Sequence, residues 1–321
     1  MSKKVIFSDI QKADIVKKYL SDKMTIKKIS LDYGISEIPI KRILREQSVT
    51  TRDPSETSRK YTLNENYFDS IDDPKKAYYF GLLMADGYNC ERRGAVTLLL
   101  VNKDEHILHD FSSDIQSTKP VVTIKHKDKK KNPNDSVFIE FCSRHLSSRL
   151  AHLGCMQAKT FKLKFPKRHL KKDLVRHFIR GYFDGDGCIS YCYAKRDNYF
   201  GNSFLSVITF TSTYDFCMFL KEYFKKEMGI HSTMLCRHPS HHNNNRTLQI
   251  SGNTQVIRIM KWMYDGADVY LQRKHLKFLE LCKILDGRNL IVSKLRSDNG
   301  KKVMLKFNEK SEKSEKLLEI S

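Results

Sequence analysis

Two acidic residues, Asp86 and Asp186, end apolar segments in the same way and lie 100 residues apart in the chain. The segments that contain them are "YYFGLLMADGYN" (78–89) and "HFIRGYFDGDGCIS" (177–190). Two carboxylates held side by side repel each other unless a cation or a proton lies between them. Carboxylate oxygens are hard ligands that suit Mg²⁺, which keeps waters and accepts phosphate oxygens. The pair therefore indicates divalent-metal chemistry on a phosphate, provided that the fold brings the two aspartates together.

The residues before each aspartate predict two helices that pack closely against each other. Gly81 and Ala85 are four residues apart and so share one helix face, and Gly181 and Gly185 repeat this spacing. Small residues at this spacing let two helix backbones approach. A glycine inside a helix costs up to about 1 kcal/mol relative to alanine, a cost that close packing would offset. If the helices are parallel, both aspartates emerge at one C-terminal end, where the helix dipole favours a cation.

The first motif helix has a predicted beginning and end. Asp73 is placed to cap it, and Pro74 suits its first position. Gly87 suits a left-handed residue at the C-terminal end. Either motif alone could be an ordinary helix end with an Asp-Gly turn, but two copies in matching register favour a paired site.

The segments after the two motifs recur in the same order. A β-rich stretch follows each motif, at "AVTLLLVN" (95–102) and at "SFLSVITFTS" (203–212). Each copy then continues so that the whole reads as helix, two strands, helix, two strands, helix. A repeat of about 100 residues is a duplicated domain rather than a solenoid unit. The sequence therefore predicts an α+β fold built from a duplicated αββαββα repeat.

Composition points to a polyanionic partner. The 321 residues carry a formal charge of +21, with 40% hydrophobic residues that are sufficient for a core. So large a basic balance makes nucleic acid the default partner, and the alternative is charge that serves solubility alone. No apolar run has the roughly 18 residues of a membrane span, and the N-terminus lacks a signal-peptide pattern. We expect a cytoplasmic protein, in a bacterial or phage-infected cell, with an organelle as the alternative.

Polar stretches divide the chain into four predicted parts, with a linker at 51–66. The parts are a small helical DNA-binding domain (1–60), a first repeat (67–165), a second repeat (166–285) and a charged C-terminal tail (286–321).

The strings "YFGLLMADG" and "IRGYFDGDG" resemble the two signature motifs of the LAGLIDADG homing endonucleases, in the single-chain form that carries both. The resemblance covers about residues 70–285, including the order of elements. In that family the last acidic residue of each motif binds the catalytic divalent metal, which implies this role for Asp86 and Asp186. It also implies a pseudo-twofold pair of repeats whose antiparallel sheets form a saddle over DNA, and cleavage across the minor groove that leaves short 3′ overhangs.

The match to the family's pattern has mild departures. Met84 stands where the family often has an acid, and Arg180 and Tyr182 are bulky, but none of the three is at the metal position. The family also carries basic residues near the scissile phosphates. Lys159 in "QAKTFKLKFP" and Lys274 in "LQRKHLKFLE" occupy comparable places, which implies that they act in catalysis. The alternative is that they contact phosphates or are simply solvated.

The N-terminal segment "TIKKISLDYGISEIPIKRILRE" (25–46) resembles a helix-turn-helix, with about 36–46 as the recognition helix. Gly34 lies at the turn, and Pro39 is tolerable in the first turn of the following helix. Ser36 is expected to cap that helix. The residues expected to face DNA are Ser36, Glu37, Lys41, Arg42 and Arg45. The alternative is an amphipathic helical hairpin with no such role.

Two polar hairpin turns occupy matching places in the repeats, "KHKDKKKNPND" (125–135) and "CRHPSHHNNNR" (236–246). We predict that both reach DNA, through Lys125, Lys127 and Arg237. The second turn also gathers Cys236 and three histidines, but their spacing matches no standard zinc site.

We therefore expect a site-specific endonuclease that cuts both strands of DNA and depends on Mg²⁺ or another divalent metal. We expect it to be a monomer whose two repeats form a pseudo-dimer, and to be encoded by a mobile element. A water on the metal would attack a phosphodiester of each strand, with the lysines balancing the developing charge. Two other functions fit the same fold: a DNA-binding regulator that does not cleave, and a group I intron maturase whose partner is the intron RNA.

Overall fold

The computed structural model describes residues 7–52, 60–126, 133–157, 159–195, 202–235 and 244–297. The chain divides into two compact units, Met1–Thr62 and Leu63–Ser321. In the described ranges, no helix combines the length and the apolar character that crossing a membrane requires.

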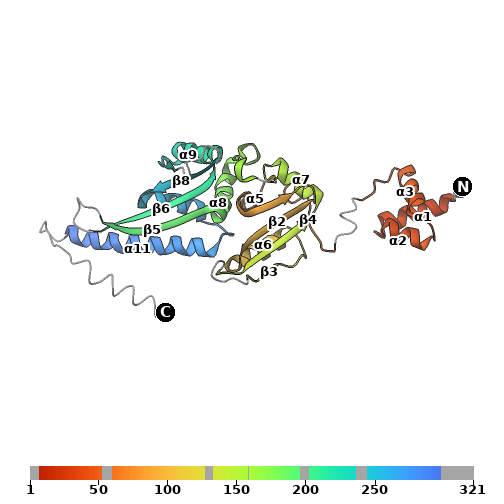
Figure 1. Ribbon diagram of the computed structural model, residues 1–321, viewed down its shortest axis with the longest axis horizontal. Helices are drawn as coiled ribbons and strands as arrows, with labels where there is room; N and C mark the ends of the chain where they lie inside the picture. The colour runs from red at the N-terminus through yellow and green to blue at the C-terminus, as the bar shows by residue number, and fades with distance from the viewer. Residues whose placement is uncertain are drawn as a thin grey trace. The chain divides into compact units, whose positions relative to one another are not determined.

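The first unit holds three helices in its described part: α1 (Asp9–Leu20), α2 (Ile26–Asp32) and α3 (Glu37–Glu46). They enclose a small core that includes Ile15, Ile29, Ile40, Ile43 and Leu44. Figure 1 shows the three helices as one bundle.

The junction between α2 and α3 follows the predicted turn closely. Gly34 takes a left-handed conformation, with φ of 62°, and Pro39 lies in the first turn of α3. Ser36 is the residue before α3 as predicted, but its side chain makes no capping hydrogen bond, so that part of the prediction is wrong.

The second unit confirms the duplicated α+β fold. The first copy contains α5 (Pro74–Asp86), β1 (Gly87–Cys90), β2 (Ala95–Val101), η1 (Asn102–Asp104), α6 (Glu105–Asp114), β3 (Val122–Ile124), β4 (Ser136–Cys142) and α7 (Arg144–His152). The second copy contains α8 (Val175–Asp186), β5 (Gly187–Lys195), β6 (Asn202–Thr213), α9 (Tyr214–Met228), β7 (Thr233–Leu235), β8 (Asn245–Ser251) and α10 (Asn253–Tyr264). Both copies follow the order αββαββα once the short η1 is set aside.

Short 3₁₀ turns link the copies, and a long helix follows the second one. The turns are η2 (Lys159–Phe161), η3 (Lys167–His169) and η4 (Lys172–Leu174), and the helix is α11 (Gln272–Ser297). Helix α11 continues past the boundary predicted at residue 285 and ends at Ser297. Residues 298–321, most of the predicted tail, lie outside the described ranges.

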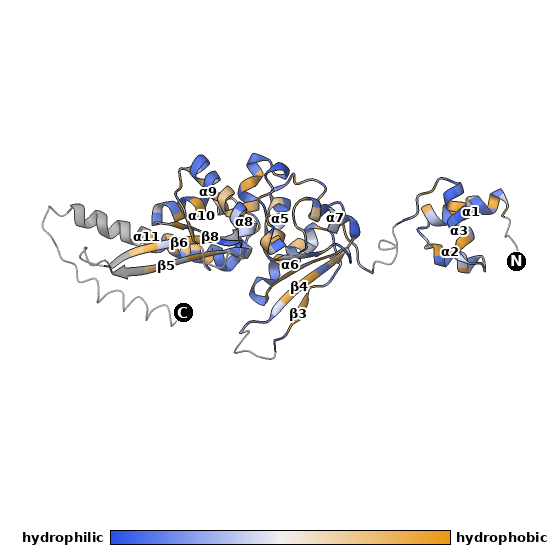
Figure 2. Ribbon diagram, turned by 45° about the horizontal axis from the view of Figure 1, so that its top comes forward, coloured by the Kyte–Doolittle hydropathy of each residue, from blue (hydrophilic) through white to orange (hydrophobic). Residues whose placement is uncertain are grey.

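Each copy has one antiparallel sheet of four strands, in the order β1-β2-β4-β3 and β5-β6-β8-β7. Helices cover one face of each sheet and leave the other face open. On β2, for example, Val96, Leu98 and Leu100 are buried, whereas Leu99 between them is 47% exposed. Figure 2 shows apolar residues along β3 and β4 in the first copy's sheet.

Helices α5 and α8 lie side by side between the two sheets (Figure 1). Asp73 caps α5 by accepting hydrogen bonds from the backbone N–H groups of Lys75 and Lys76, with Pro74 at the first helical position, as predicted. Eight consecutive residues of α5, from Ala77 to Met84, are buried. A helix buried on all sides is the expected result when one element packs on two sheets and a neighbouring helix.

Candidate active site

Two glycines let α5 and α8 cross with their backbones in contact. A Cβ atom on Gly81 would collide with the carbonyl oxygen of Phe178 and lie 2.9 Å from the backbone nitrogen of Tyr182. A Cβ atom on Gly181 would collide with the carbonyl oxygen of Tyr78 and lie 3.0 Å from the backbone nitrogen of Leu82. The two sets of contacts are the same once 100 is added to each residue number, so the helix pair has the pseudo-twofold symmetry of the sequence.

The helix pair stays close as far as its C-terminal end. A Cβ atom on Gly185 would collide with the Cβ atom of Ala85 and lie 3.1 Å from Oδ2 of Asp86. The Asp86 carboxylate on one helix therefore lies against the backbone of the other helix, one residue before Asp186. The small-residue spacing predicted this approach, and the structure confirms it.

The glycines that follow the two aspartates are needed for space rather than for a left-handed turn. Gly87 has φ of −74° and Gly187 has φ of −92°, both with extended ψ, so the predicted left-handed cap at Gly87 is wrong. Each glycine is also the first residue of a strand, β1 or β5. A Cβ atom there would lie 2.5 Å from the carbonyl oxygen of Leu83 or Phe183. The chain thus passes directly from helix to strand, which fixes the aspartates at the rim of the sheets.

The electrostatics of the site disfavour two bare carboxylates. Desolvation and then the charge of Asp186 raise the pKa of Asp86 from 3.8 to about 6. Desolvation likewise raises the pKa of Asp186. Both side chains nevertheless keep a solvent-exposed face. A pair of partly desolvated carboxylates that is open on one side offers hard oxygen ligands to a cation that arrives from solvent.

Lys274 lies at the C-terminal end of α8. It is 5% exposed. Its Nζ donates hydrogen bonds to the carbonyl oxygens of Phe183 (2.5 Å), Asp184 (2.6 Å), Gly185 (3.3 Å) and Gly187 (2.7 Å). Burial lowers the pKa of Lys274 to about 8, against the opposing effect of the Asp184 carboxylate. The ammonium group therefore satisfies carbonyls that the helix leaves unpaired at its end.

Lys159 has the matching place at the end of α5. Its Nζ donates a hydrogen bond to the carbonyl oxygen of Gly87, the first residue of β1. Both predicted lysines thus lie at the ends of the motif helices. Desolvation has the largest effect on the pKa of each aspartate, and it raises that pKa. The charges of Lys274 and Lys159 both lower the two pKa values. Lys274 has the larger effect of the two lysines on Asp86, and Lys159 has the larger effect on Asp186.

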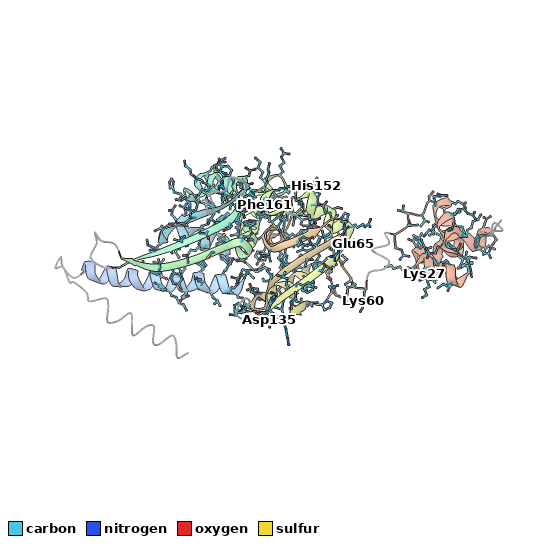
Figure 3. All side chains as sticks on the ribbon, viewed as in Figure 1. Lys27, Lys60, Glu65, Asp135, His152 and Phe161 are labelled. Carbon is cyan, nitrogen blue, oxygen red and sulfur yellow. The ribbon has the colours of Figure 1, made fainter. Side chains whose placement is uncertain are left out.

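The segment that carries Lys159 is tied to the second copy's sheet. Thr213 Oγ1 donates a hydrogen bond to the Leu163 carbonyl (2.5 Å), and Asn244 Nδ2 donates one to the Phe161 carbonyl (3.1 Å). Phe161, labelled in Figure 3, lies on the segment between the two copies. Lys159 therefore depends on contacts to both copies for its position.

Asp184 is a buried acid beside the site that sequence reasoning missed. Its carboxylate is fully buried and accepts hydrogen bonds from Tyr78 Oη (2.9 Å), Tyr264 Oη and the backbone nitrogen of Leu271 (2.8 Å). Desolvation raises its pKa, and its hydrogen bonds and the Lys274 charge oppose that shift. The one sequence clue was an acid inside an otherwise apolar helix segment, two residues before Asp186.

The bulky departures from the family pattern also have structural partners. Arg180 is 2% exposed, and its guanidinium donates hydrogen bonds to the carbonyls of Val269 (3.0 Å) and Met263 (2.9 Å). Tyr182 Oη donates a hydrogen bond to the Thr211 carbonyl (2.9 Å). Both side chains hydrogen-bond to the second copy, and the Arg180 guanidinium also lies over the Tyr78 ring of α5, 5.2 Å from its centroid.

A divalent cation fits the two aspartates by the chemistry of the donors. Within the described ranges, no group of three or more His, Cys, Asp or Glu side chains that could hold a metal is found. Asp86 and Asp186 would therefore supply carboxylate oxygens only, and other ligands would come from water and phosphate, as is common for Mg²⁺. The raised pKa values fit this arrangement, because a cation relieves the repulsion that keeps protons on the pair.

The predicted DNA contacts in the first unit all lie on or next to α3. Two of them are paired with neighbours along the helix, Lys41 Nζ with Glu37 at 3.0 Å and Arg42 Nε with Glu46 at 3.6 Å. Ser36, Lys41 and Arg45 are exposed, whereas Glu37 and Arg42 are half-buried.

The predicted DNA contacts in the hairpin turns are only partly described. Lys125 follows β3 and is exposed. Lys127, Arg237, Cys236 and the three histidines of the second turn lie outside the described residues.

The raised pKa of Asp86 predicts a pH-dependent effect on stability. Asp86→Asn should raise the thermal unfolding midpoint at pH 7, because the folded protein disfavours the ionised carboxylate and asparagine is neutral. With a pKa of 3.8 for ordinary aspartate and about 6 in the fold, the penalty is absent below about pH 4 and complete above about pH 6. Melting curves of both proteins between pH 4 and 7 should diverge as the pH rises. A wild type that melts higher than the variant at pH 7 would contradict this account.

Comparison with known proteins relates the second copy to a described family. A family model for a LAGLIDADG-like domain matches residues 173–261, which contain Asp186 but not Asp86. No curated protein sequence matches the chain.

Solved structures that are similar to the chain include three DNA-bound LAGLIDADG proteins. The meganuclease I-AabMI bound to uncleaved DNA shares 12% identity over 70% of this chain and 97% of that chain, with a TM-score of 0.47. The homing endonuclease I-LtrWI bound to target DNA shares 10% sequence identity over 70% of this chain and 92% of that chain, with a TM-score of 0.45. The homing endonuclease I-GzeII in complex with its DNA target shares 11% sequence identity over 71% of this chain and 93% of that chain, with a TM-score of 0.46.

Proposed function

We propose that this protein is a site-specific, metal-dependent DNA endonuclease that cuts both strands of a duplex. The observation that carries this proposal is the meeting of Asp86 and Asp186 at the joint end of α5 and α8. Three observations support it. Both aspartates have raised pKa values, and Lys159 and Lys274 donate hydrogen bonds to carbonyl oxygens at the ends of the two helices. Residues 173–261 also match a LAGLIDADG-like domain.

The chain's own residues account for three tasks in such a reaction. Asp86 and Asp186 would hold a divalent cation at the end of the helix pair, and such an ion would supply positive charge against a phosphate and lower the pKa of water. Lys159 and Lys274 fix the helix ends and add positive potential at the same place. The glycine contacts hold the two carboxylates in one geometry, so little rearrangement is needed when a phosphate arrives.

The open faces of the two sheets suit a long duplex. The pseudo-twofold relation of the copies gives two similar faces, one for each half of a target. The formal charge of +21 supplies the attraction for phosphates. We further propose that the first unit reads flanking base pairs through α3, with Lys41, Arg42 and Arg45 near the duplex.

A DNA-binding regulator that does not cleave is the second candidate, because the same faces would bind DNA without chemistry. The presence of both aspartates, each with a raised pKa, favours the nuclease. An RNA maturase is a third proposal. Measuring the affinity of the protein for RNA and for DNA side by side distinguishes a maturase from a DNA endonuclease.

The proposal is tested with a duplex selected for binding. Random-sequence DNA is first enriched for tight binders in Ca²⁺, and the enriched pool is then incubated in Mg²⁺, Mn²⁺ or EDTA. We expect defined double-strand ends in Mg²⁺ or Mn²⁺ and intact DNA in EDTA. Tight, specific binding without cleavage in either metal would instead identify the regulator.

Deleting residues 1–62 should weaken DNA binding but keep cleavage at high protein concentration, because both aspartates lie in the second unit. The loss of basic contacts should also make the slope of log affinity against log salt shallower. The measurement is a salt titration of binding with a cleavage assay alongside. A folded truncation that cannot cleave at any concentration would show that the first unit takes part in the chemistry.

A further inference from the structure

Asn89 and Asp184 are two buried polar side chains near the site, and neither has a role in the proposed chemistry. Asn89 lies on β1, three residues after Asp86, and is 1% exposed. Asp184 lies on α8, two residues before Asp186, and is fully buried. A buried polar side chain costs stability unless it is hydrogen-bonded, so each one must have a structural purpose.

Asn89 holds the segment that leads to Lys159. Its Nδ2 donates hydrogen bonds to the carbonyl oxygens of Cys155 (2.8 Å) and Ser147 (2.9 Å), and its Oδ1 accepts one from Ser147 Oγ (2.5 Å). Cys155 lies four residues before Lys159, at the exit from α7. The amide thus ties the turn that carries Lys159 to the strand that begins at Gly87.

Asp184 holds the segment that leads to Lys274. Its Oδ2 accepts a hydrogen bond from the backbone nitrogen of Leu271 (2.8 Å), which is the residue before α11. Lys274 lies three residues later and donates to the carbonyl oxygen of Asp184 itself at 2.6 Å. Tyr78 of α5 and Tyr264 of α10 complete the carboxylate's hydrogen bonds.

The two anchors are chemically different, although the repeats that contain them are related. One hundred residues from Asp184 stands Met84, and one hundred residues from Asn89 stands Ile189, both buried apolar side chains. Each copy therefore has one anchor and lacks the other. A change at one anchor leaves the hydrogen bonds of the other intact.

We propose that Asn89 and Asp184 are positioning residues that act separately, Asn89 through Lys159 and Asp184 through Lys274. Lys159 contacts the carbonyl of Gly87, next to Asp86, whereas Lys274 contacts the carbonyls of Gly185 and Gly187, on either side of Asp186. Loss of one anchor therefore biases cleavage toward one strand, and loss of the other anchor biases it toward the opposite strand. The strand bias rests on the proposed nuclease function, whereas the positioning of the lysines does not.

The first experiment measures lysine reactivity and needs no DNA. Limited acetylation followed by mass spectrometry compares Lys159 and Lys274 in the wild type, Asp184→Asn and Asn89→Asp, two nearly isosteric exchanges. In Asp184→Asn, an amide N–H₂ group replaces an oxygen that accepts hydrogen bonds in the wild type, so that donor faces donor. In Asn89→Asp, an oxygen replaces the N–H₂ group that donates to two carbonyls, so that acceptor faces acceptor. We expect Asp184→Asn to raise the reactivity of Lys274 by about tenfold, the scale of one lost buried hydrogen bond, with Lys159 unchanged. Asn89→Asp should give the reverse. The Asp184 charge raises the pKa of Lys274, so its loss acts in the same direction, and the uncharged exchange Tyr264→Phe separates the two causes.

Milder variants keep the test decisive if an exchange prevents folding. Tyr264→Phe removes one donor to Asp184, and Ser147→Ala removes the donor to Asn89 Oδ1. Each should give a smaller rise in reactivity at its own lysine alone. Equal rises at both lysines, or no rise at either, would overturn the proposal, because they indicate general loosening or no coupling.

The second experiment follows each strand of an end-labelled target. Asp184→Asn should show the same strand bias as Lys274→Met, and Asn89→Asp the same bias as Lys159→Met, with the two biases opposite. Equal slowing of both strands by either anchor variant would refute the strand bias. If the wild type cleaves no DNA, the nuclease proposal fails, and the acetylation result still decides whether the two residues position the lysines.

Discussion

Asp86→Asn and Asp186→Asn, made singly, should each abolish double-strand cleavage in Mg²⁺ while leaving specific binding in Ca²⁺ nearly intact. Asparagine keeps the size of the side chain, so the packing of Ala85 and Gly185 beside it should survive. It removes the negative charge that a hard divalent cation requires. We expect a loss of at least about two orders of magnitude in rate, the scale of removing one preorganised electrostatic contact. Plasmid relaxation and linearisation, beside gel-shift binding, measure both effects.

Asp110→Asn is the matched control, because Asp110 is an exposed aspartate on α6. It should cleave at the wild-type rate. If the two carboxylates act on separate cations, each active-site variant should still nick one strand, and if they share a cation, both strands should fail together. Linearisation at the wild-type rate by either active-site variant would remove Asp86 and Asp186 from the mechanism.

Gly81→Ala and Gly181→Ala should each destabilise the second unit severely, by about 3 kcal/mol, at the upper end of typical overpacking. The added Cβ atom collides with a backbone carbonyl of the other helix, and backbone in a crossing of two buried helices cannot move aside cheaply. Urea unfolding followed by circular dichroism gives the free energy of unfolding. Cleavage should fall with it, because the aspartates depend on the same crossing.

Gly287→Ala is the control for this pair. Gly287 lies on α11, and a Cβ atom there would meet no atom within 4 Å. Alanine should therefore be neutral or stabilise the helix by up to about 1 kcal/mol. If Gly81→Ala proved as stable as wild type, the helices would have to lie farther apart than the structure places them.

Features that repeat along the chain were predictable from the sequence. The motif at 100-residue spacing, the small residues four apart and the recurring order of elements predicted the αββαββα duplication and the close helix pair. The start of α5 at Asp73 and Pro74 was equally predictable from the sequence. These features are local or periodic, so each depends on neighbours in the chain or on a pattern that the sequence displays twice.

Tertiary structure decided the contacts that join distant segments. The extended conformation of Gly87 depends on the strand pairing that begins there, and the local turn rule therefore gave the wrong dihedral angles. Asp184 became a candidate only when Tyr78, Tyr264 and Leu271, each at least 80 residues away, met its carboxylate. Lys274 likewise reached its four carbonyls through the placement of α11. Whether a buried polar group is satisfied depends on partners brought together by packing, and no periodicity of the sequence encodes which partners those are.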